Sequence, residues 1–378
     1  MAKNDKMASE GFSKEDWLDR MFRKSESKGT RSCAQTSLVV FDYFCQEQLG
    51  SNGKSMLQMM EKYQKWFNQD KPDIRSICMS LDKFVSFMGK NHDDILVNTN
   101  ATFKAKQPKT IKLYFGFIKS YLRICHGIKL STEDIQDYVQ FPKQRKEPRR
   151  PISIDILKLL FGICDRERRA LYYVLITSGM RLGEGLSLKK SNFHLDEKPV
   201  RVTLLADDTK TKEGRETYIT SEALERLKPI LEKKKDNEYL FHNADDIHIA
   251  VMREVRYFMR LREKLGLTER YSNSVRSVVN IHSFRAYFHT KASQKHGSDY
   301  ANALDGHGAY LKQYYREDPK ERAKKYLELE PNLLIESVTI EAEQVNAKLM
   351  SDMQEQLIRM QDEIDRLKKY PQAGLLIS

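Results

Sequence analysis

The chain has 378 residues, of which 40% are hydrophobic, 10% aromatic and 31% charged, which is typical of a folded protein with two domains and appendages. Its formal net charge of +12 favours a polyanionic partner such as nucleic acid, although a solvated basic surface without such a partner has the same composition. The N-terminus lacks the apolar core of a signal peptide, and no run reaches the roughly 18 apolar residues of a membrane span. We therefore expect an intracellular, cytoplasmic protein.

The five cysteines are odd in number and never form a C-x-x-C pair. Each lies in or beside an apolar helical stretch, so we expect buried thiols in a reducing compartment. The histidines show no zinc-ligand spacing with them, and we expect no metal site. The cysteines are Cys33, Cys45, Cys78, Cys125 and Cys164.

Residues 1–29 are polar apart from a few apolar side chains, and we expect a flexible arm or a short helix there. Across residues 30–141, apolar side chains recur at helical spacing in four stretches, the last of which follows Pro108 and ends near Gly127. Four amphipathic helices predict a compact, all-helical domain. Its aromatic side chains are expected in the core rather than as platforms for stacking bases.

Residues 142–151, PKQRKEPRRP, interrupt the helical pattern. Three prolines favour an extended linker between two domains. An extended basic segment suits a chain that crosses a phosphate backbone, although a solvated linker without a partner has a similar composition. The candidate phosphate contacts are Lys143, Arg145, Lys146, Arg149 and Arg150.

Residues 152–335 predict a second domain that is mainly α-helical with a small antiparallel sheet. Ser153 is a candidate N-cap for the first of two helices that run through Leu175. The segments VRVTLL and RETYIT alternate on either side of DDTKTKEG and predict a hairpin. Further helices are expected from Ser221, near Ile249, from His282 and around Tyr300.

Residues 336–378 form a tail in which apolar residues recur every 3.5 positions over about three heptads. This pattern predicts a short coiled coil, or a helix that docks on a partner or on the body of the protein. The a and d positions are Met350, Met353, Leu357, Met360, Ile364 and Leu367.

The residues in the last third of the chain suit phosphate-ester chemistry. His282 and Arg285 share one helical face, on which His289 is expected to be structural, and His307 follows a glycine. Guanidinium groups stabilise the charge that accumulates on phosphate oxygens, and a tyrosine ester conserves the energy of a broken phosphodiester. Each element alone is more typical of packing or of a solvated surface; their order along the chain is unusual.

These motifs resemble the tyrosine recombinase (phage integrase) family, in particular integrases of archaeal type, over roughly residues 30–330. TSGMRLGE is similar to the first arginine box, which implies that Arg181 contacts the scissile phosphate and that Glu184 supports it. HSFR is similar to the second box and implies catalytic roles for His282 and Arg285. LDGHGAY resembles the Leu-x-Gly-His element and implies a role for His307, although its Asp305 replaces a residue that is usually apolar.

The same resemblance implies a general acid and a nucleophile. By spacing from Arg215, Lys210 matches the lysine of the hairpin turn better than Lys212. Tyr315, directly before an arginine, matches the nucleophile of archaeal-type integrases, with Tyr314 as the alternative.

The resemblance implies a helical, SAM-like core-binding domain over 30–141 and a catalytic domain over 152–335. The chain is expected to be a site-specific DNA recombinase that acts without metal or ATP, associates with the nucleoid and forms a tetramer on recombination sites. Residues 320–340 and the heptad tail are candidates for exchange between subunits, and an accessory DNA-bending protein is a further candidate partner. The alternatives are a type IB topoisomerase, a catalytically silent DNA-binding protein of the same fold, and an assembly scaffold.

Overall fold

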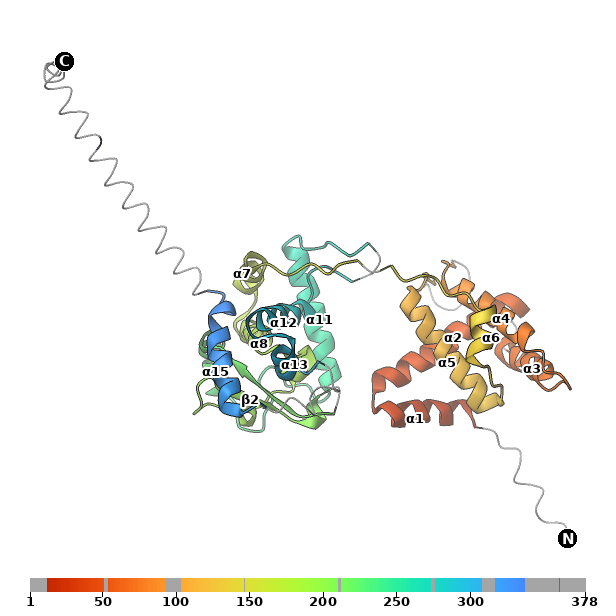
Figure 1. Cartoon of the computed structure of the whole chain (residues 1–378), viewed down its shortest axis with the longest axis horizontal. Coiled ribbons are helices and arrows are strands. Elements are labelled where there is room, and N and C mark those ends of the chain that lie inside the picture. Colours follow the sequence, from red (N-terminus) through yellow and green to blue (C-terminus); the bar gives the residue numbers. More distant parts are fainter. Residues whose placement is uncertain are drawn as a thin grey trace, which may run out of the picture. The chain divides into compact units, whose positions relative to one another are not determined.

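The computed structural model describes residues 12–50, 54–92, 103–145, 147–209, 212–272, 276–307, 317–336 and 360. The chain divides into two compact units, Met1–Lys146 and Glu147–Ser378 (Figure 1). The expected fold class is confirmed, because the described residues are mainly α-helical with one three-stranded antiparallel sheet. None of the helices in the described ranges is long and apolar enough to cross a membrane.

The first unit is built from helices that start where the sequence supplies caps. Ser13 and Ser131 each form a capping box with an aspartate three residues later, and Pro108 occupies the first turn of its helix. The rings of Phe41, Phe44 and Phe84 contact one another in the core, as predicted. The helices are α1 (Lys14–Ser25), α2 (Lys28–Leu49), α3 (Ser55–Phe67), α4 (Ile74–Met88), α5 (Pro108–His126) and α6 (Thr132–Tyr138).

Helix α1 agrees with the short helix, and not with the flexible arm, that were the two expectations for residues 1–29. Trp17 is fully buried, and its ring packs edge-on against Tyr121 with the centroids 5.3 Å apart. Its indole nitrogen donates a hydrogen bond of 3.2 Å to the hydroxyl of Ser120. The apolar stripe of α1 is too short to show a period in the sequence, but one tryptophan buries enough surface to fix the helix. Residues 1–11 lie outside the described ranges.

The second unit is organised around a helix that is buried on all sides. Helix α8 (Arg166–Ser178) has buried side chains at every position from Ala170 to Ser178, and it contacts α10, α12 and β3. A helix that is enclosed all round marks the centre of a core. The other helices are α7 (Ile154–Ile163), α9 (Leu182–Leu186), α10 (Ser221–Leu231), α11 (Ile247–Lys264), α12 (His282–His296), α13 (Ser298–Asp305) and α15 (Pro319–Leu329).

The sheet contains the predicted hairpin and one short additional strand. Strands β1 (Phe193–His194), β2 (Val200–Leu204) and β3 (Arg215–Ile219) pair in that order and antiparallel. Leu204 pairs with Arg215, and Val202 pairs with Thr217. This register turns the side chains of Arg215 and Thr217 to the interior of the unit, where both are buried.

The C-terminal half of the basic linker is fixed to the second unit. The carboxylate of Glu147 accepts hydrogen bonds from the backbone N–H and hydroxyl of Ser272 at 2.9 and 2.8 Å. The Arg150 guanidinium lies 2.7 Å from the carboxylate of Glu269, and Arg149 lies over the ring of Tyr271 at 4.3 Å. The extended linker predicted over 142–151 is therefore anchored from Glu147 onward, because its arginines have partners in this unit.

The segment that ends the described fold also packs on its own chain. The side chains of Tyr326, Leu329, Leu333 and Ile335 are fully buried, and the Tyr326 hydroxyl donates to the carbonyl of Thr177 at 2.7 Å. The backbone N–H groups of residues 335 and 336 donate to the Glu222 carboxylate. Most of the segment 320–340, expected as a candidate for exchange between subunits, thus belongs to the core of this unit. Apart from Met360, the heptad positions lie outside the described residues.

All five cysteines are free thiols. Burial raises the pKa of Cys78 and of Cys164 to about 11, so these thiols are protonated at neutral pH and act as apolar core groups.

Replacement of Trp17 by alanine tests whether α1 belongs to the folded unit. We expect Trp17→Ala to lower the free energy of unfolding by about 3–5 kcal/mol, because a buried aromatic side chain is lost. The chain's two tryptophans, Trp17 and Trp66, both lie in the first unit, so Trp66 fluorescence in urea reports this unit alone. The exposed Phe12 gives the control, Phe12→Ala, for which a change within about 0.5 kcal/mol is expected. An unchanged midpoint for Trp17→Ala would show that α1 is dispensable.

Candidate active site

The turn between α8 and α9 requires a glycine. Gly179 caps α8 in the left-handed region with φ +67°, and a Cβ at this position would lie 2.4 Å from Cδ1 of Phe288. The close approach of the turn to α12 lets the Gly179 carbonyl accept a hydrogen bond of 2.6 Å from the guanidinium of Arg285. The glycine of TSGMRLGE thus brings the two predicted arginine boxes together.

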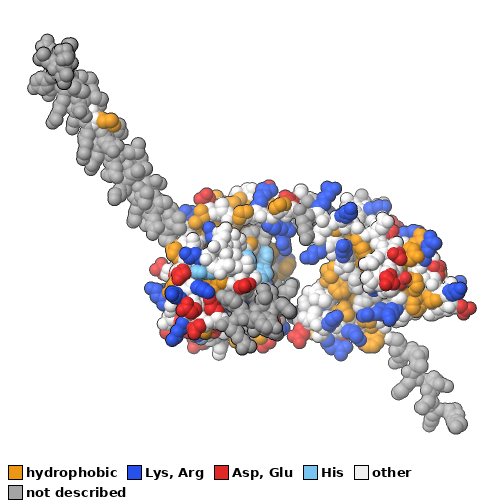
Figure 2. Space-filling view, in the orientation of Figure 1, with side chains coloured by type: hydrophobic (Ala, Val, Ile, Leu, Met, Phe, Trp, Pro, Cys, Tyr) orange, Lys and Arg blue, Asp and Glu red, His pale blue; other side chains and the backbone are white. Residues whose placement is uncertain are grey.

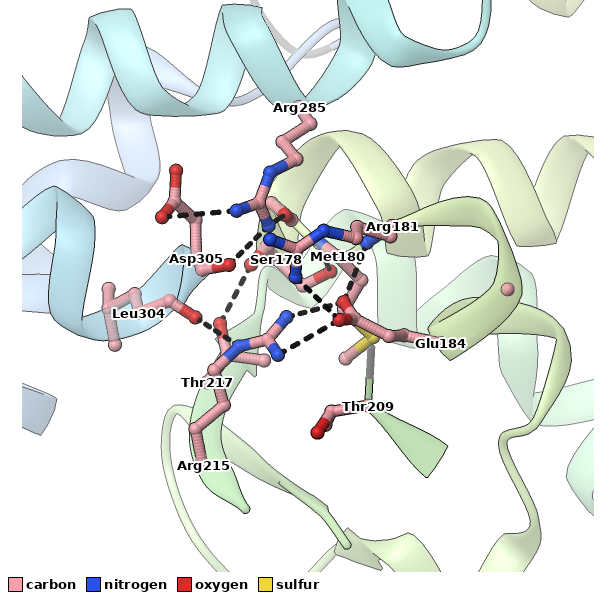
Figure 3. Close-up of polar contacts among 12 residues, drawn as sticks. Ser178, Met180, Arg181, Glu184, Thr209, Arg215, Thr217, Arg285, Leu304 and Asp305 are labelled. Carbon is pink, nitrogen blue, oxygen red and sulfur yellow. Dashed lines mark hydrogen bonds and ion pairs between the residues drawn. The ribbon is translucent and has the colours of Figure 1, made fainter. Parts of the chain in front are cut away.

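A buried carboxylate joins two arginines (Figure 3). Glu184 Oε1 accepts from the Arg181 guanidinium at 2.8 Å, and Oε2 accepts from the Arg181 backbone N–H at 2.8 Å. The guanidinium of Arg215 forms a bidentate pair with the same carboxylate at 2.6 and 3.2 Å. Burial raises the pKa of Glu184, but the hydrogen bonds and charges of Arg215 and Arg181 outweigh it and lower the pKa below its ordinary value. The carboxylate is therefore ionised and holds both cations.

Arg215 is a member of the site that the sequence analysis missed. Its Nε donates to the carbonyl of Leu304 at 3.0 Å, so it also fixes the end of α13. The sequence analysis used Arg215 only to count back to Lys210. A signal was present, because the alternation of β3 places residue 215 on the same face as Thr217 and Ile219, where an arginine must find a buried anion.

Arg285 is the most enclosed cation of the site, with 2% of its side chain exposed. It donates to the carbonyls of Gly179 and Asp305, and its Nη2 lies 3.4 Å from Oδ1 of Asp305. Burial lowers the pKa of Arg285 to about 10, with Arg181 and Arg215 adding to the shift and Asp305 opposing it. The guanidinium stays protonated at neutral pH and is fixed from several sides.

The two predicted histidines flank this guanidinium and reach solvent. His282 begins α12 one turn before Arg285, and burial of part of its ring, with the charges of Arg285 and Arg276, lowers its pKa. His307 follows Gly306, which takes φ +78°, and half of its side chain is exposed. Figure 2 shows histidine and Lys or Arg side chains beside one another on one face of this unit. His282 is thus neutral at pH 7 and suited to hydrogen bonding rather than to ion pairing.

Asp305, which the sequence analysis noted only as a replacement for a residue that is usually apolar, lies at the centre of the site. Its carboxylate is fully buried, and Oδ2 lies 2.8 Å from Nδ1 of His307 and 2.8 Å from Nδ1 of His289. The sequence does not show that His289 contacts Asp305 and His307, because His289 lies in α12, whereas Asp305 ends α13 and His307 follows it.

Asp305, His289 and His307 also have the composition of a metal site, with their ligand atoms within 4.8 Å of one another. The Arg285 guanidinium lies 3.1 Å from His307 Nδ1, and a fixed positive charge at that distance opposes a divalent cation. The cluster is therefore better suited to hydrogen bonding than to metal binding.

Four predicted site residues lie outside the described residues: the catalytic candidates Lys210, Tyr314 and Tyr315, and the linker candidate Lys146. Thr209, which directly precedes Lys210, is buried, and its hydroxyl accepts from the backbone N–H of Glu213 at 3.1 Å. Lys210 therefore follows a residue whose hydroxyl accepts a hydrogen bond across the turn between β2 and β3.

A groove of about 950 Å³ lies beside the site and includes His282 in its wall. It also includes four cationic side chains, those of Arg149, Arg150, Arg276 and Lys291. The groove belongs entirely to the second unit and extends the positive charge of the site along its surface.

Residues 154–308 match the model of the phage integrase family. The expected relationship to the tyrosine recombinase (phage integrase) family, and with it the enzyme class, is confirmed over this range. No curated protein sequence matches the chain.

Several solved structures are similar at low identity. The integrase of transposon Tn1549 in complex with transposon right end DNA has a TM-score of 0.46 at 13% identity, covering 76% of this chain and 98% of its own. A lambda integrase tetramer bound to a Holliday junction has 0.47 at 14%, covering 81% and 79%. The XerH recombinase bound to difH has 0.43 at 18%, covering 82% and 93%. These likenesses are distant, and the family relationship rests on residues 154–308.

Replacement of Gly179 by alanine should disrupt the junction of the two arginine boxes. We expect Gly179→Ala to lower the stability of the second unit by about 2–4 kcal/mol, because left-handed strain adds to the clash with Phe288. Hydrogen exchange of the α8 amides measures this free energy. Gly162→Ala is the matched control, because a Cβ there meets no atom within 4 Å, and it should be neutral or stabilising by up to about 1 kcal/mol.

Neutralising Glu184 should leave two arginines without their shared counter-charge. We expect Glu184→Gln to cost about 3–5 kcal/mol at pH 7, measured by the same exchange experiment. Since the folded pKa of Glu184 is lowered, its contribution is complete above the unfolded value, about 4.3, and is lost as pH falls through the folded pKa. The difference between wild type and Glu184→Gln should therefore shrink in acid. A difference that does not change with pH would contradict the ionic interpretation.

Proposed function

We propose that this chain, whose residues 154–308 match the phage integrase family, is a site-specific DNA recombinase that cuts and rejoins strands through a 3′-phosphotyrosyl intermediate. The observation that carries the proposal is the convergence of Arg181, Arg285, His282 and His307 around two buried carboxylates, Glu184 and Asp305. Such a cluster of fixed cationic and hydrogen-bonding groups suits a phosphodiester.

The exposures of these side chains fit that role. Arg181 keeps 26% of its side chain exposed while Glu184 holds it, and His282 and His307 both reach solvent. Arg285 is buried and ties the turn at Gly179 to α13. We infer that Arg181 and His282 contact the non-bridging oxygens directly, and that Arg285 supplies a fixed positive field behind them.

The proposed reaction is a transesterification in which no bond energy is lost to water. The phenol oxygen of Tyr315 bonds to phosphorus as the bond to the 5′-oxygen breaks; the phenol proton passes to a base, and Lys210 donates a proton to the leaving oxygen. A 5′-hydroxyl of the partner strand then attacks the phosphotyrosine and releases the tyrosine. Tyr314 remains the alternative nucleophile. The step needs neither a metal ion nor ATP.

DNA binding is proposed to use both units. The first unit would act as a core-binding domain, and the groove with Arg276 and Lys291 would follow the backbone beside the site. Among the linker candidates, Lys143 and Arg145 are exposed, whereas Arg150 pairs with Glu269 and Arg149 covers Tyr271. The last two are therefore weaker candidates for phosphate contacts than their sequence suggested.

The assembly is proposed to be a tetramer on two recombination sites, with residues beyond Glu336 as the remaining candidates for exchange between subunits. An accessory DNA-bending protein and association with the nucleoid are further parts of this proposal. A type IB topoisomerase is the second candidate, because the same residues support relaxation of supercoils by one subunit that reseals its own strand.

Covalent trapping tests the proposed chemistry. Wild type, Tyr315→Phe and Tyr314→Phe are incubated in EDTA with nicked duplexes from the DNA that flanks the gene, and the products are separated on a denaturing gel. We expect a protein–DNA adduct in wild type and in Tyr314→Phe, and none in Tyr315→Phe, because the phenol oxygen forms the bond.

The other outcomes are equally informative. Loss of the adduct in Tyr314→Phe alone would assign the nucleophile to Tyr314. Adducts together with supercoil relaxation, but without exchange between two duplexes, would favour the topoisomerase. No adduct from any variant, on DNA that the protein demonstrably binds, would favour a silent DNA-binding protein.

A further inference from the structure

The carboxylate of Asp305 is surrounded by groups that donate hydrogen bonds. Oδ1 accepts from the backbone N–H of His307 at 2.9 Å and lies 3.4 Å from Nη2 of Arg285. Oδ2 lies 2.8 Å from Nδ1 of both His307 and His289. Figure 3 shows the carboxylate beside Arg285, at the end of α13. Since the side chain is fully buried, these contacts replace its hydration.

The position of this carboxylate determines which nitrogen of His307 carries the proton. A carboxylate oxygen only accepts, so an Nδ1 atom 2.8 Å away must carry a hydrogen; an Nδ1 lone pair there would face a negative charge. The contact of 3.1 Å between Nδ1 and Arg285 Nη2 then joins two donors and is not a hydrogen bond. In this tautomer Nε2 of neutral His307 carries a lone pair, on the opposite edge of the ring from Asp305.

His289 competes for the same oxygen. Its ring lies edge-on to that of His307, with the centroids 5.4 Å apart, and it donates to Oδ2 from α12. The other charged or titratable groups near the pair are Arg285 and His282 on α12, Arg215 on β3, and the Arg181–Glu184 pair. Because Arg285 already neutralises the carboxylate, a proton on His289 and a proton on His307 oppose each other.

We propose that Asp305 is a positioning residue that holds His307 in the Nδ1–H tautomer, with Nε2 left to serve the reaction, and that His289 moderates this pair by sharing Oδ2. The catalytic consequence of this tautomer rests on the proposed function. In the proposed reaction, Nε2 of His307 accepts the phenol proton as the tyrosine attacks, and it returns the proton in the reverse step. A carboxylate behind the imidazole stabilises the protonated ring that forms.

Two substitutions should change the tautomer population of His307 in opposite directions. Asp305→Asn removes the anionic acceptor at Nδ1, so the fraction of the Nδ1–H form should fall. His289→Gln removes a competitor for Oδ2, so that fraction should rise. His296→Gln is the matched control, because His296 lies on the same helix but contacts the Lys325 carbonyl, and it should leave His307 unchanged.

Nitrogen NMR of the full-length protein without DNA measures these populations. The ring nitrogens of ¹⁵N-labelled histidines distinguish the two tautomers, and His307→Gln identifies the His307 signals by their loss. In the neutral ring of wild type we expect Nδ1–H with an unprotonated Nε2, and opposite changes of this population in the two variants. An Nε2–H tautomer in wild type, or an Nδ1–H population that His289→Gln lowers, would overturn the proposal. If Asp305→Asn does not fold, His289→Gln alone decides.

The adduct assay adds a readout that depends on the chemistry. We expect Asp305→Asn to slow adduct formation about 10–100-fold, with Asp305→Glu recovering part of the rate by restoring the carboxylate. A wild type that shows the expected tautomer but forms no adduct would refute the proposed function and leave the tautomer assignment standing. A folded Asp305→Asn with the wild-type rate at every pH would overturn the positioning role.

Discussion

Two buried carboxylates hold the second unit together at its functional centre. Three guanidinium groups lie within contact of Glu184 and Asp305, and neither the arginines nor the acids would be stable in a core alone, because an unpaired buried charge costs several kcal/mol. The five residues come from the α8–α9 turn, α9, β3, α12 and the end of α13. Charge pairing therefore fixes the relative positions of elements that apolar packing alone would leave free to slide.

This arrangement pairs the buried arginines with carboxylates and leaves the more exposed cationic and hydrogen-bonding groups facing solvent. Arg215 and Arg285 pair with buried carboxylates and donate to backbone carbonyls. The side chains of Arg181, His282 and His307 are partly exposed to solvent. The buried layer holds the exposed layer rigid, so a phosphate would meet groups that need no further reorganisation. Gly179 allows α12 to approach the α8–α9 turn this closely, because a side chain at this position would clash with Phe288 of α12.

The sequence predicted the elements of this fold well and the connections within the site only in part. Helical spacing, the cap at Ser153 and the alternation of the hairpin each follow from local rules, and those elements are present. The motifs pointed to Arg181, Glu184, His282, Arg285 and His307, which lie near one another in the structure; their catalytic roles stay predictions. Arg215, Asp305 and His289 were undervalued because their roles depend on distances between elements far apart in the chain, which no local pattern encodes. Helix α1 was expected only as an alternative to a flexible arm, because just two buried side chains, Trp17 and Leu18, anchor it.

The anchoring of the linker has a consequence for how the two units search for a target. Phe141 packs its ring against Phe115 at 4.9 Å in the first unit, and Glu147 is held by Ser272 in the second. The intervening stretch spans at most about 20 Å when fully extended. In the proposed DNA complex, binding of one unit would confine the other to a small volume around it, which corresponds to a local concentration on the order of millimolar. Two individually weak contacts would then act as one strong contact, and lengthening the stretch between Phe141 and Glu147 would dilute that advantage without altering either unit.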